Sequence, residues 1–306
     1  MFSFKSKTRS DSLNALVIMP DGVSSATVKQ TKNGKPLLQH CAYNALAPGQ
    51  EMDALLTNVV AGMRKAPCST LLDSSDYQLL MVEAPEVPSS ELKAAIRWRI
   101  RDLIDFHIDD AVLDVFDTPP SGARGVQEHL YTVVSRSAVV KEKADTLQNA
   151  GAPLEIIDIP EMALRNIAAR LDQDAGGQAT MYFGAEQGLI TLTRDATLYL
   201  ARSLDIGYRQ LKETPELVDR LALELQRSMD YYDRHFQQAP ISAITLCPTP
   251  EPLPFIADQL TQLTGIDVHE LSMDDLVESS SPVDDELFAR CLLAIGTALR
   301  SEPKEL

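Results

Sequence analysis

Hydrophobic and polar positions alternate in the same layout over two separate stretches of the chain. Residues 15–43 read as three short strands, ALVIM, ATVKQT and PLLQHCAY, with the turn PDGVSS after the first and the hairpin signal Asn33-Gly34 after the second. Residues 179–205 repeat this order as ATMYF, GLITLTR and TLYLARSLD. Strand-forming runs separated by such turns predict antiparallel meanders. Two matching meanders about 160 residues apart predict two related domains.

Helical patterns follow each meander. Apolar residues at helical spacing predict a helix within residues 49–66 and a longer one over residues 214–236, where Thr214 is the expected N-cap and Pro215 the first helical residue. Further strands are predicted at LEIIDI, ISAITLC and IDVHEL, and further helices at residues 138–150, MALRNIAARL, LPFIADQLTQLTG and ELFARCLLAIGTALR. The acidic, Ser-rich stretch at 274–286 predicts a loop. This alternation indicates an α/β protein.

A compact module interrupts the first domain. YQLLMVEAP predicts a strand, SSELKAAIRWRIRDLI a helix, and AVLDVFDTP and EHLYTVVSR two more strands joined by the loop SGARG. We therefore assign residues 76–136 to an inserted strand-helix-strand-strand module. The first domain is then expected to comprise residues 12–75, 137–178 and 286–306, and the second domain residues 179–285.

The composition is that of a globular, acidic protein. Of the 306 residues, 44% are apolar and 24% charged, and the net charge is −16, which argues against a nucleic-acid partner. The four cysteines form no CxxC pair and the five histidines lie alone, so no metal site is expected. No apolar run approaches the ~20 residues of a membrane span, and the basic N-terminus has no apolar stretch behind it. We expect a cytoplasmic protein with a flexible N-terminal tail.

The order of elements resembles that of actin-like ATPases, and the inserted module resembles that of the PilM-like proteins of type IV pilus assembly. The stretch VEAPEVPSSELKAAIRWRIRDLIDFHIDDAVLDVFD is similar to the PilM-like proteins of mannose-sensitive haemagglutinin (MSHA) pilus systems. The layout matches over nearly the whole chain, whereas this stretch carries the specific similarity. The resemblance implies an actin-like (ribonuclease H-like) two-domain fold and a place at the cytoplasmic face of the inner membrane.

The resemblance also implies a nucleotide cleft between the domains, held by an Asp-x-Gly turn in each meander and by a glycine pair after a late strand. The positions that correspond to the two turns are Asp21 and Gly22, and Gly184 and Glu186. On the long helix, Glu224 and Arg227 match positions that approach the ribose and base in the family, although the polar side of a helix with a buried apolar stripe is the favoured explanation of these two.

All three loops depart from the family pattern. Pro20 precedes Asp21 and breaks the spacing, Tyr182 takes the place of the second acid, and Pro248, Thr249 and Pro250 occupy the base-binding turn. A phenol supplies no carboxylate for Mg²⁺-bound water. We therefore expect a degenerate ATPase site with no catalytic residue and no cofactor; retained ATP and Mg²⁺ at the six positions is the alternative.

The module helix is basic within an acidic chain. Its expected buried stripe is Leu92, Ala95, Ile96, Ile100, Leu103 and Ile104. Its other sides carry four cations and the only tryptophan, and we take Lys93, Arg97, Trp98 and Arg101 as candidate partner-binding residues. A solvated face that balances nearby aspartates explains the same pattern equally well.

The resemblance implies that the N-terminal cytoplasmic peptide of a PilN-like inner-membrane protein binds beside the module, in a groove between it and the first domain. An assembly motor ATPase is a second candidate partner. Two functions remain open from the residues. One is a non-catalytic scaffold, peripheral to the inner membrane, in a type IV pilus machine. The other is an actin-like ATPase that slowly hydrolyses ATP to regulate assembly. A sugar kinase is disfavoured because no catalytic aspartate is convincingly placed.

Overall fold

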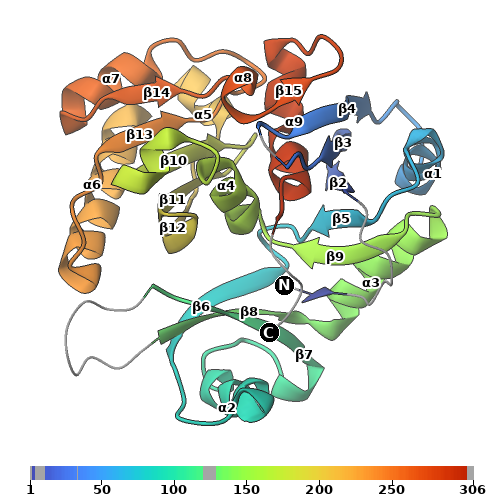
Figure 1. Ribbon diagram of the computed structural model, residues 1–306, viewed down its shortest axis with the longest axis horizontal. Coiled ribbons are helices and arrows are strands. Elements are labelled where there is room, and N and C mark those ends of the chain that lie inside the picture. The colour runs from blue at the N-terminus through green and yellow to red at the C-terminus, as the bar shows by residue number, and fades with distance from the viewer. Residues whose placement is uncertain (1, 4–10, 33, 120–128, 302–306) are drawn as a thin grey trace.

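The computed structural model describes residues 2–3, 11–32, 34–119 and 129–301. It contains two large β-sheets covered by helices and one smaller sheet (Figure 1). The first sheet has seven strands in the order β1-β9-β5-β2-β3-β4-β15. They are β1 (Phe2–Ser3), β9 (Leu154–Asp158), β5 (Cys68–Leu71), β2 (Ser12–Met19), β3 (Gly22–Lys29), β4 (Leu37–Ala45) and β15 (Glu278–Ser279). β2, β3 and β4 form the first antiparallel meander, and β5 and β9 extend the sheet in parallel.

The second sheet has five strands in the order β12-β11-β10-β13-β14. They are β10 (Gln178–Phe183), β11 (Gly188–Arg194), β12 (Thr197–Leu204), β13 (Ala243–Leu246) and β14 (Val268–Glu270). The second meander is antiparallel, and β13 and β14 continue in parallel. Each sheet thus has the three meander strands in reverse order followed by two parallel strands. This duplication confirms the predicted α/β, actin-like (ribonuclease H-like) two-domain fold.

Helices cover both faces of these sheets. α1 (Met52–Gly62) and α3 (Ser137–Asn149) share a core with the outer face of the first sheet. α5 (Tyr208–Glu213), α6 (Leu217–Phe236) and α7 (Ile256–Thr264) share a core with the second sheet. α4 (Pro160–Ala168) and α9 (Asp285–Ala298) lie between the two sheets. Short elements are α8 (Met273–Leu276) and the 3₁₀ turns η1 (Ile108–Asp110) and η2 (Asp172–Gly176).

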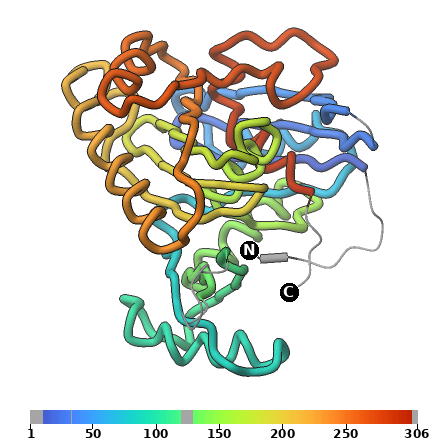
Figure 2. The backbone as a smooth tube through the Cα atoms, turned by 60° about the vertical axis from the view of Figure 1, so that its left-hand side comes forward, coloured from blue at the N-terminus to red at the C-terminus, as the bar shows by residue number. Residues whose placement is uncertain are grey.

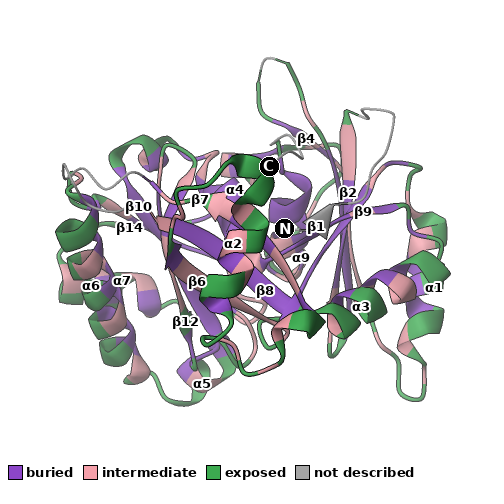
Figure 3. Ribbon diagram, turned by 90° about the horizontal axis from the view of Figure 1, so that it is seen from below, coloured by how far each residue is buried: buried purple, intermediate pink, exposed green. Residues whose placement is uncertain are grey.

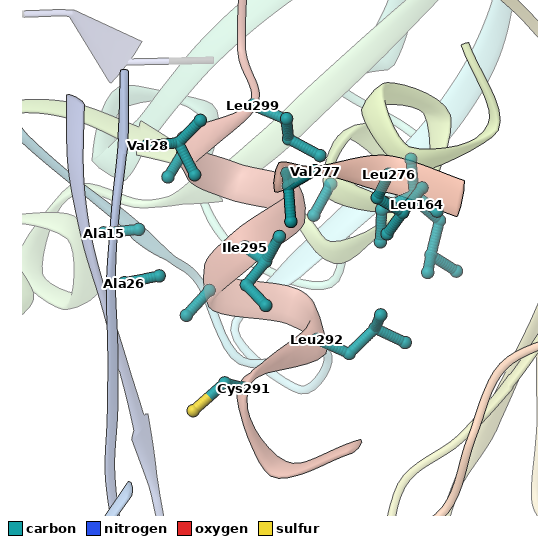
Figure 4. Close-up of a cluster of buried hydrophobic side chains, with 14 of the residues drawn as sticks. Ala15, Ala26, Val28, Leu164, Leu276, Val277, Cys291, Leu292, Ile295 and Leu299 are labelled. Atoms are coloured by element: carbon teal, nitrogen blue, oxygen red, sulfur yellow. The ribbon is translucent and has the colours of Figure 1, made fainter. Parts of the chain in front are cut away.

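An apolar core fills the space between the two domains. Figure 4 shows Cys291, Leu292 and Ile295 of α9 between the strands of the first sheet and Leu164 of α4. The same cluster includes Leu189 of the second sheet and extends to Tyr182, which is partly buried against it. α4 and α9 cross closely: a Cβ at Gly296 would lie 2.6 Å from the carbonyl oxygen of Ala163, so only glycine fits there.

The inserted module is a three-stranded sheet, β6-β8-β7, with one helix, α2 (Ser89–Ile100). Its strands are β6 (Tyr77–Glu83), β7 (Ala111–Asp117) and β8 (His129–Arg136), all antiparallel. α2 covers the outer face through Ile96 and Ile100. The inner face packs on α4 and β12 (Figures 1 and 2). Figure 3 shows α2 outermost, with mostly exposed residues.

The structure corrects several sequence-based expectations. The turn after β2 contains only Pro20 and Asp21, because Gly22 already pairs with Met19. α6 begins at Leu217 instead of residue 214, because Thr214 closes the unpredicted helix α5. α2 ends at Ile100, so Leu103 is 56% exposed and not part of a buried stripe.

The segment at 274–286 and the N-terminal residues also differ from expectation. The predicted loop at 274–286 contains most of α8 and all of β15, and β15 pairs with β4 of the first sheet although it lies within the range assigned to the second domain. β1 pairs with β9 where a flexible tail was expected. Asn33 and the loop SGARG lie outside the described residues. Over the described residues, no helix has the length and apolarity to cross a membrane.

Candidate functional site

The turn between β2 and β3, where the resemblance implies a phosphate loop, is a tight hairpin held by aromatic and cationic neighbours. The Tyr43 hydroxyl donates to the Asp21 carbonyl at 2.9 Å, and the Arg290 guanidinium lies 3.6 Å from the Asp21 carboxylate and 4.6 Å from the Tyr43 ring centre. Burial, with Asp21 adding, raises the pKa of Tyr43 to about 12. A Cβ at Gly22 would lie 2.4 Å from the Asn44 carbonyl, so this glycine serves the β3–β4 contact. A two-residue turn leaves no loop of amides to cradle a phosphate.

The second turn, between β10 and β11, packs against the start of α5. The Gly184 amide donates to Gln187 within the turn at 2.8 Å, while the Gly184 carbonyl accepts from the Tyr208 amide at 2.9 Å. The Glu186 carboxylate lies 3.0 Å from the Arg209 guanidinium and 3.2 Å from the Gln210 side-chain amide. Gly184 and Glu186 therefore hold the start of α5 in place.

Tyr182, at the position where the resemblance implies an acid, lies close to Cys247. Burial raises the pKa of Tyr182 above its ordinary value, and burial also raises the pKa of the Cys247 thiol. Both side chains belong to the apolar core between the domains, Tyr182 at its margin. This position thus holds a neutral phenol within a packed core and no carboxylate.

The third turn and the long helix use their polar groups internally. Thr249 donates its hydroxyl to the Glu251 carbonyl at 2.7 Å, and the Glu251 carboxylate pairs with Lys212 of α5. On α6, the Glu224 carboxylate lies 3.0 Å from Arg202 and 2.7 Å from Arg227. Glu224 thus links α6 to β12 through Arg202, whereas Arg227 pairs with Glu224 within α6.

The six candidate nucleotide residues belong to three networks of hydrogen bonds and ion pairs, of which the first two approach each other, because Arg290 and Arg209 both act on the Glu251 carboxylate. Asp21 and Gly22 belong to the first hairpin, Gly184 and Glu186 to the α5 contact, and Glu224 and Arg227 to the α6–β12 contact. Among the described residues, no group of three or more histidine, cysteine or acidic side chains could hold a metal ion. The three acids among them each pair with an arginine, and ATP with Mg²⁺ at these positions stays the alternative.

The structure also separates the four candidate partner-binding residues of α2. Arg97 turns inward and donates to the Ala111 carbonyl at 3.1 Å and to the Ile108 carbonyl. Lys93 pairs with Asp114 at 2.9 Å. Trp98 is 73% exposed and Arg101 lies 5.9 Å from its ring centre. The side chains of Arg101 and Lys93 are 53% and 54% exposed, so only Arg97 of this set turns inward.

A cavity of about 300 Å³ lies where the module meets the main body. Its walls come from β6 and β8 of the module, from α4, and from β12 and α6 of the second domain (Figure 1). The lining residues are Ser74, Tyr77, Leu79, Met81, Tyr131, Glu161, Leu200, Ala201, Ser203 and Tyr231. A second cavity of about 720 Å³ lies at the end of the first domain, between α1, β5 and the turn at Gly151.

A buried carboxyl group lies in the wall of the first cavity, which we call the module groove. Glu161 is 4% exposed and accepts a 2.5 Å hydrogen bond from the Tyr77 hydroxyl. Burial raises the pKa of the Glu161 carboxyl above its ordinary value, whereas the Tyr77 hydrogen bond lowers it. Sequence reasoning missed this pair, because the two residues are 84 positions apart and no local pattern connects them.

Comparisons with known proteins give a structural match without a sequence family. No protein-family model and no curated protein sequence matches the chain. A chain of the PilM–PilN type IV pilus biogenesis complex matches with a TM-score of 0.74 and 20% identity, over 95% of this chain and 98% of that one. The cytoplasmic domain of EpsL, an inner-membrane component of the type II secretion system of Vibrio cholerae, matches with a TM-score of 0.53 and 12% identity, over 95% and 96%.

The matches extend over almost the entire chain, so they include the inserted module as well as the duplicated sheets. They place the chain among proteins with the actin-like α/β fold. At these identities the likeness defines the fold, and the function has to be argued from the site.

Proposed function

We propose that this chain is a non-catalytic cytoplasmic scaffold of a type IV pilus biogenesis machine of the MSHA type, comparable to MshI. It would act at the cytoplasmic face of the inner membrane, where it binds the N-terminal cytoplasmic peptide of a PilN-like protein. The observation that carries the proposal is the module groove in a fold shared over 95% of the chain with a member of the PilM–PilN complex.

The state of the cleft supports a scaffold over an ATPase. Phosphoryl transfer depends on positioned Mg²⁺ and on donors that stabilise the transferring phosphate. Here Glu186 pairs with Arg209, Tyr182 stands in the acid's place, and apolar side chains fill the space between the domains. Opening the cleft would expose that core to water. This would cost free energy, because burial of apolar surface is worth about 25 cal/mol per Å².

The module groove has the chemistry of a peptide site. Its walls combine aliphatic and aromatic side chains with a few fixed polar groups, as is typical of pockets that bind a ligand specifically. It lies between the module and α4 of the first domain, as the resemblance implies, and the second domain closes its remaining side. A peptide bound there would contact all three parts of the molecule.

Isothermal titration tests this function. The probe is a synthetic peptide that copies the N-terminal cytoplasmic segment of the PilN-like protein from the same organism. Ser203→Trp places a bulky side chain at the groove from an exposed position. Gln226→Trp is the matched control, because Gln226 is exposed on α6 and does not line the groove.

We expect the wild-type chain and Q226W to bind the peptide equally and S203W to bind it at least about tenfold more weakly, a loss of about 1.4 kcal/mol. Absence of binding to the wild-type chain would refute the proposed function. Equal binding by S203W would place the peptide elsewhere.

We assign the exposed part of α2, Trp98 and Arg101, to a second protein contact, with the assembly motor ATPase as the candidate. Trp and Arg are enriched where interfaces derive most of their energy. Replacing both residues, Trp98→Ala with Arg101→Glu, should abolish pull-down of the purified motor while peptide binding stays unchanged. Arg97 is unsuitable for this test because its side chain holds the η1 turn. Unchanged motor pull-down would remove this assignment.

A further inference from the structure

β12 is a long strand at the edge of a sheet. It has eight residues, whereas the strand at the opposite edge of the same sheet, β14, has three, and the edge strands of the first sheet, β1 and β15, have two each. Along its outer side, β12 pairs with no strand of the described residues. Its outward backbone groups therefore have no strand partner within the described residues.

The usual devices that protect an edge are missing from the part of β12 between Leu200 and Ser203. This part contains no proline, and its single charge, Arg202, is drawn along α6 by Glu224 at 3.0 Å and by the Ser228 hydroxyl at 2.9 Å. One outer carbonyl just before it is covered: the Tyr131 hydroxyl of the module donates to the Tyr199 carbonyl at 2.8 Å. The module thus touches the edge at Tyr199, and Ala201 is partly buried against the cluster that includes Val133 of the module, while Leu200, Ala201 and Ser203 line the cavity.

The part of β12 from Leu200 to Ser203 faces the module groove. Leu200, Ala201 and Ser203 line one wall, and Leu79 and Met81, on one face of β6, line the wall opposite. Two opposite walls of this kind suit an extended chain, since one wall supplies backbone hydrogen bonds and the other supplies apolar contacts for alternate side chains.

We propose that the peptide in the module groove binds as an added β-strand, paired with β12 over Leu200–Ser203. The inference rests on the proposed function, because it describes how the same groove takes its ligand. The paired stretch spans about four peptide residues, or about 13 Å. Alternate peptide side chains face the apolar surface of β6, so the groove selects an extended segment with apolar residues at every second position.

A backbone N-methyl scan of the PilN-like peptide tests this inference. Each methyl group removes one amide donor and blocks approach to β12 at that position. We expect methylation at alternate residues of the bound stretch to weaken binding about tenfold or more, and methylation at the intervening residues to change it less than about twofold. Peptide binding should also slow hydrogen exchange of the β12 amides, with β14 as the internal control.

The outcomes separate this inference from the proposed function. A peptide that binds with no alternation in the scan and no added protection of β12 overturns strand addition and leaves the scaffold function standing. A peptide that does not bind at all overturns both. A concentration-dependent dimer of the wild-type chain that S203W abolishes would show that a second copy occupies the edge, and would overturn the assignment of the edge to the peptide.

Discussion

A buried ion pair joins the two segments that connect the domains. Asp158 ends β9 immediately before α4, and Arg300 follows α9. The Arg300 Nη1 atom lies 2.7 Å from Asp158 Oδ2, and the two side chains are 3% and 1% exposed. Both residues belong to segments of the first domain, so this pair fixes the start of α4 relative to the end of α9, the two helices that cross between the domains.

Removing either partner should strongly destabilise the chain. At an effective dielectric constant of about 20, the attraction across 2.7 Å is about 6 kcal/mol before desolvation is subtracted. Loss of one partner leaves the other charge buried without compensation, which costs about 3–5 kcal/mol. We therefore expect Arg300→Met and Asp158→Asn each to lower the free energy of unfolding by about that amount. The double variant should lose less than the sum of the two single losses by at least about 2 kcal/mol.

Urea unfolding followed by circular dichroism at pH 7 measures these losses, with m-values compared to verify that the same transition is observed. Lys141→Met is the control, because Lys141 forms an exposed pair with Asp145 on α3 and its loss should cost no more than about 0.5 kcal/mol. Single losses below about 1 kcal/mol, or a double variant that loses the full sum, would refute the proposed coupling between the two crossing segments.

Three further predictions concern particular side chains. Burial raises the pKa of the Glu161 carboxyl above its ordinary 4.5, so the folded chain binds the proton more tightly than the unfolded chain, and the stability of the fold falls as pH rises from 4.5 through the raised pKa. Glu161→Gln should remove this pH dependence from melting temperatures measured between pH 4 and 8. An unchanged pH dependence in the variant would contradict the prediction. Arg97→Met should cost about 1–3 kcal/mol by removing two hydrogen bonds to backbone carbonyls of the module, whereas Arg101→Met should stay within about 0.5 kcal/mol. Equal losses in urea unfolding would argue against the different roles. Tyr182→Asp should cost about 3 kcal/mol or more by burying an unpaired acid in the core between the domains, without creating Mg-ATP binding, and a variant that binds Mg-ATP would show that the cleft needs only its missing acid.

Local patterns in the sequence predicted most strands and helices, and the resemblance to a known family supplied their actin-like arrangement. The strands of both meanders follow from period-two alternation between turn residues, and the end of α7 follows from Gly265, which has the left-handed conformation expected of a helix C-cap. The short turn at Pro20–Asp21 was missed because glycine suggested a wider loop, whereas Gly22 belongs to a strand and permits close approach to Asn44.

The site was less predictable because it depends on contacts between distant residues. Helical spacing placed Ile96 and Ile100 inside the module but gave no reason to expect that Arg97 would reach carbonyls 11 and 14 residues further on. The module groove joins Tyr77, Glu161 and Tyr231 from three parts of the chain. Each of these residues has an ordinary local pattern, and only the packing of the module on α4 and α6 brings them together.

The central claim is the proposal that the chain binds no nucleotide and acts by binding a peptide. Thermal unfolding with and without saturating Mg-ATP tests it most directly. A ligand at 100 times its dissociation constant adds about 2.7 kcal/mol, which would raise the melting temperature of a chain of this size by about 4 °C. The account predicts no shift with Mg-ATP and a shift of this size with the PilN-like peptide. A shift with Mg-ATP and none with the peptide would contradict it.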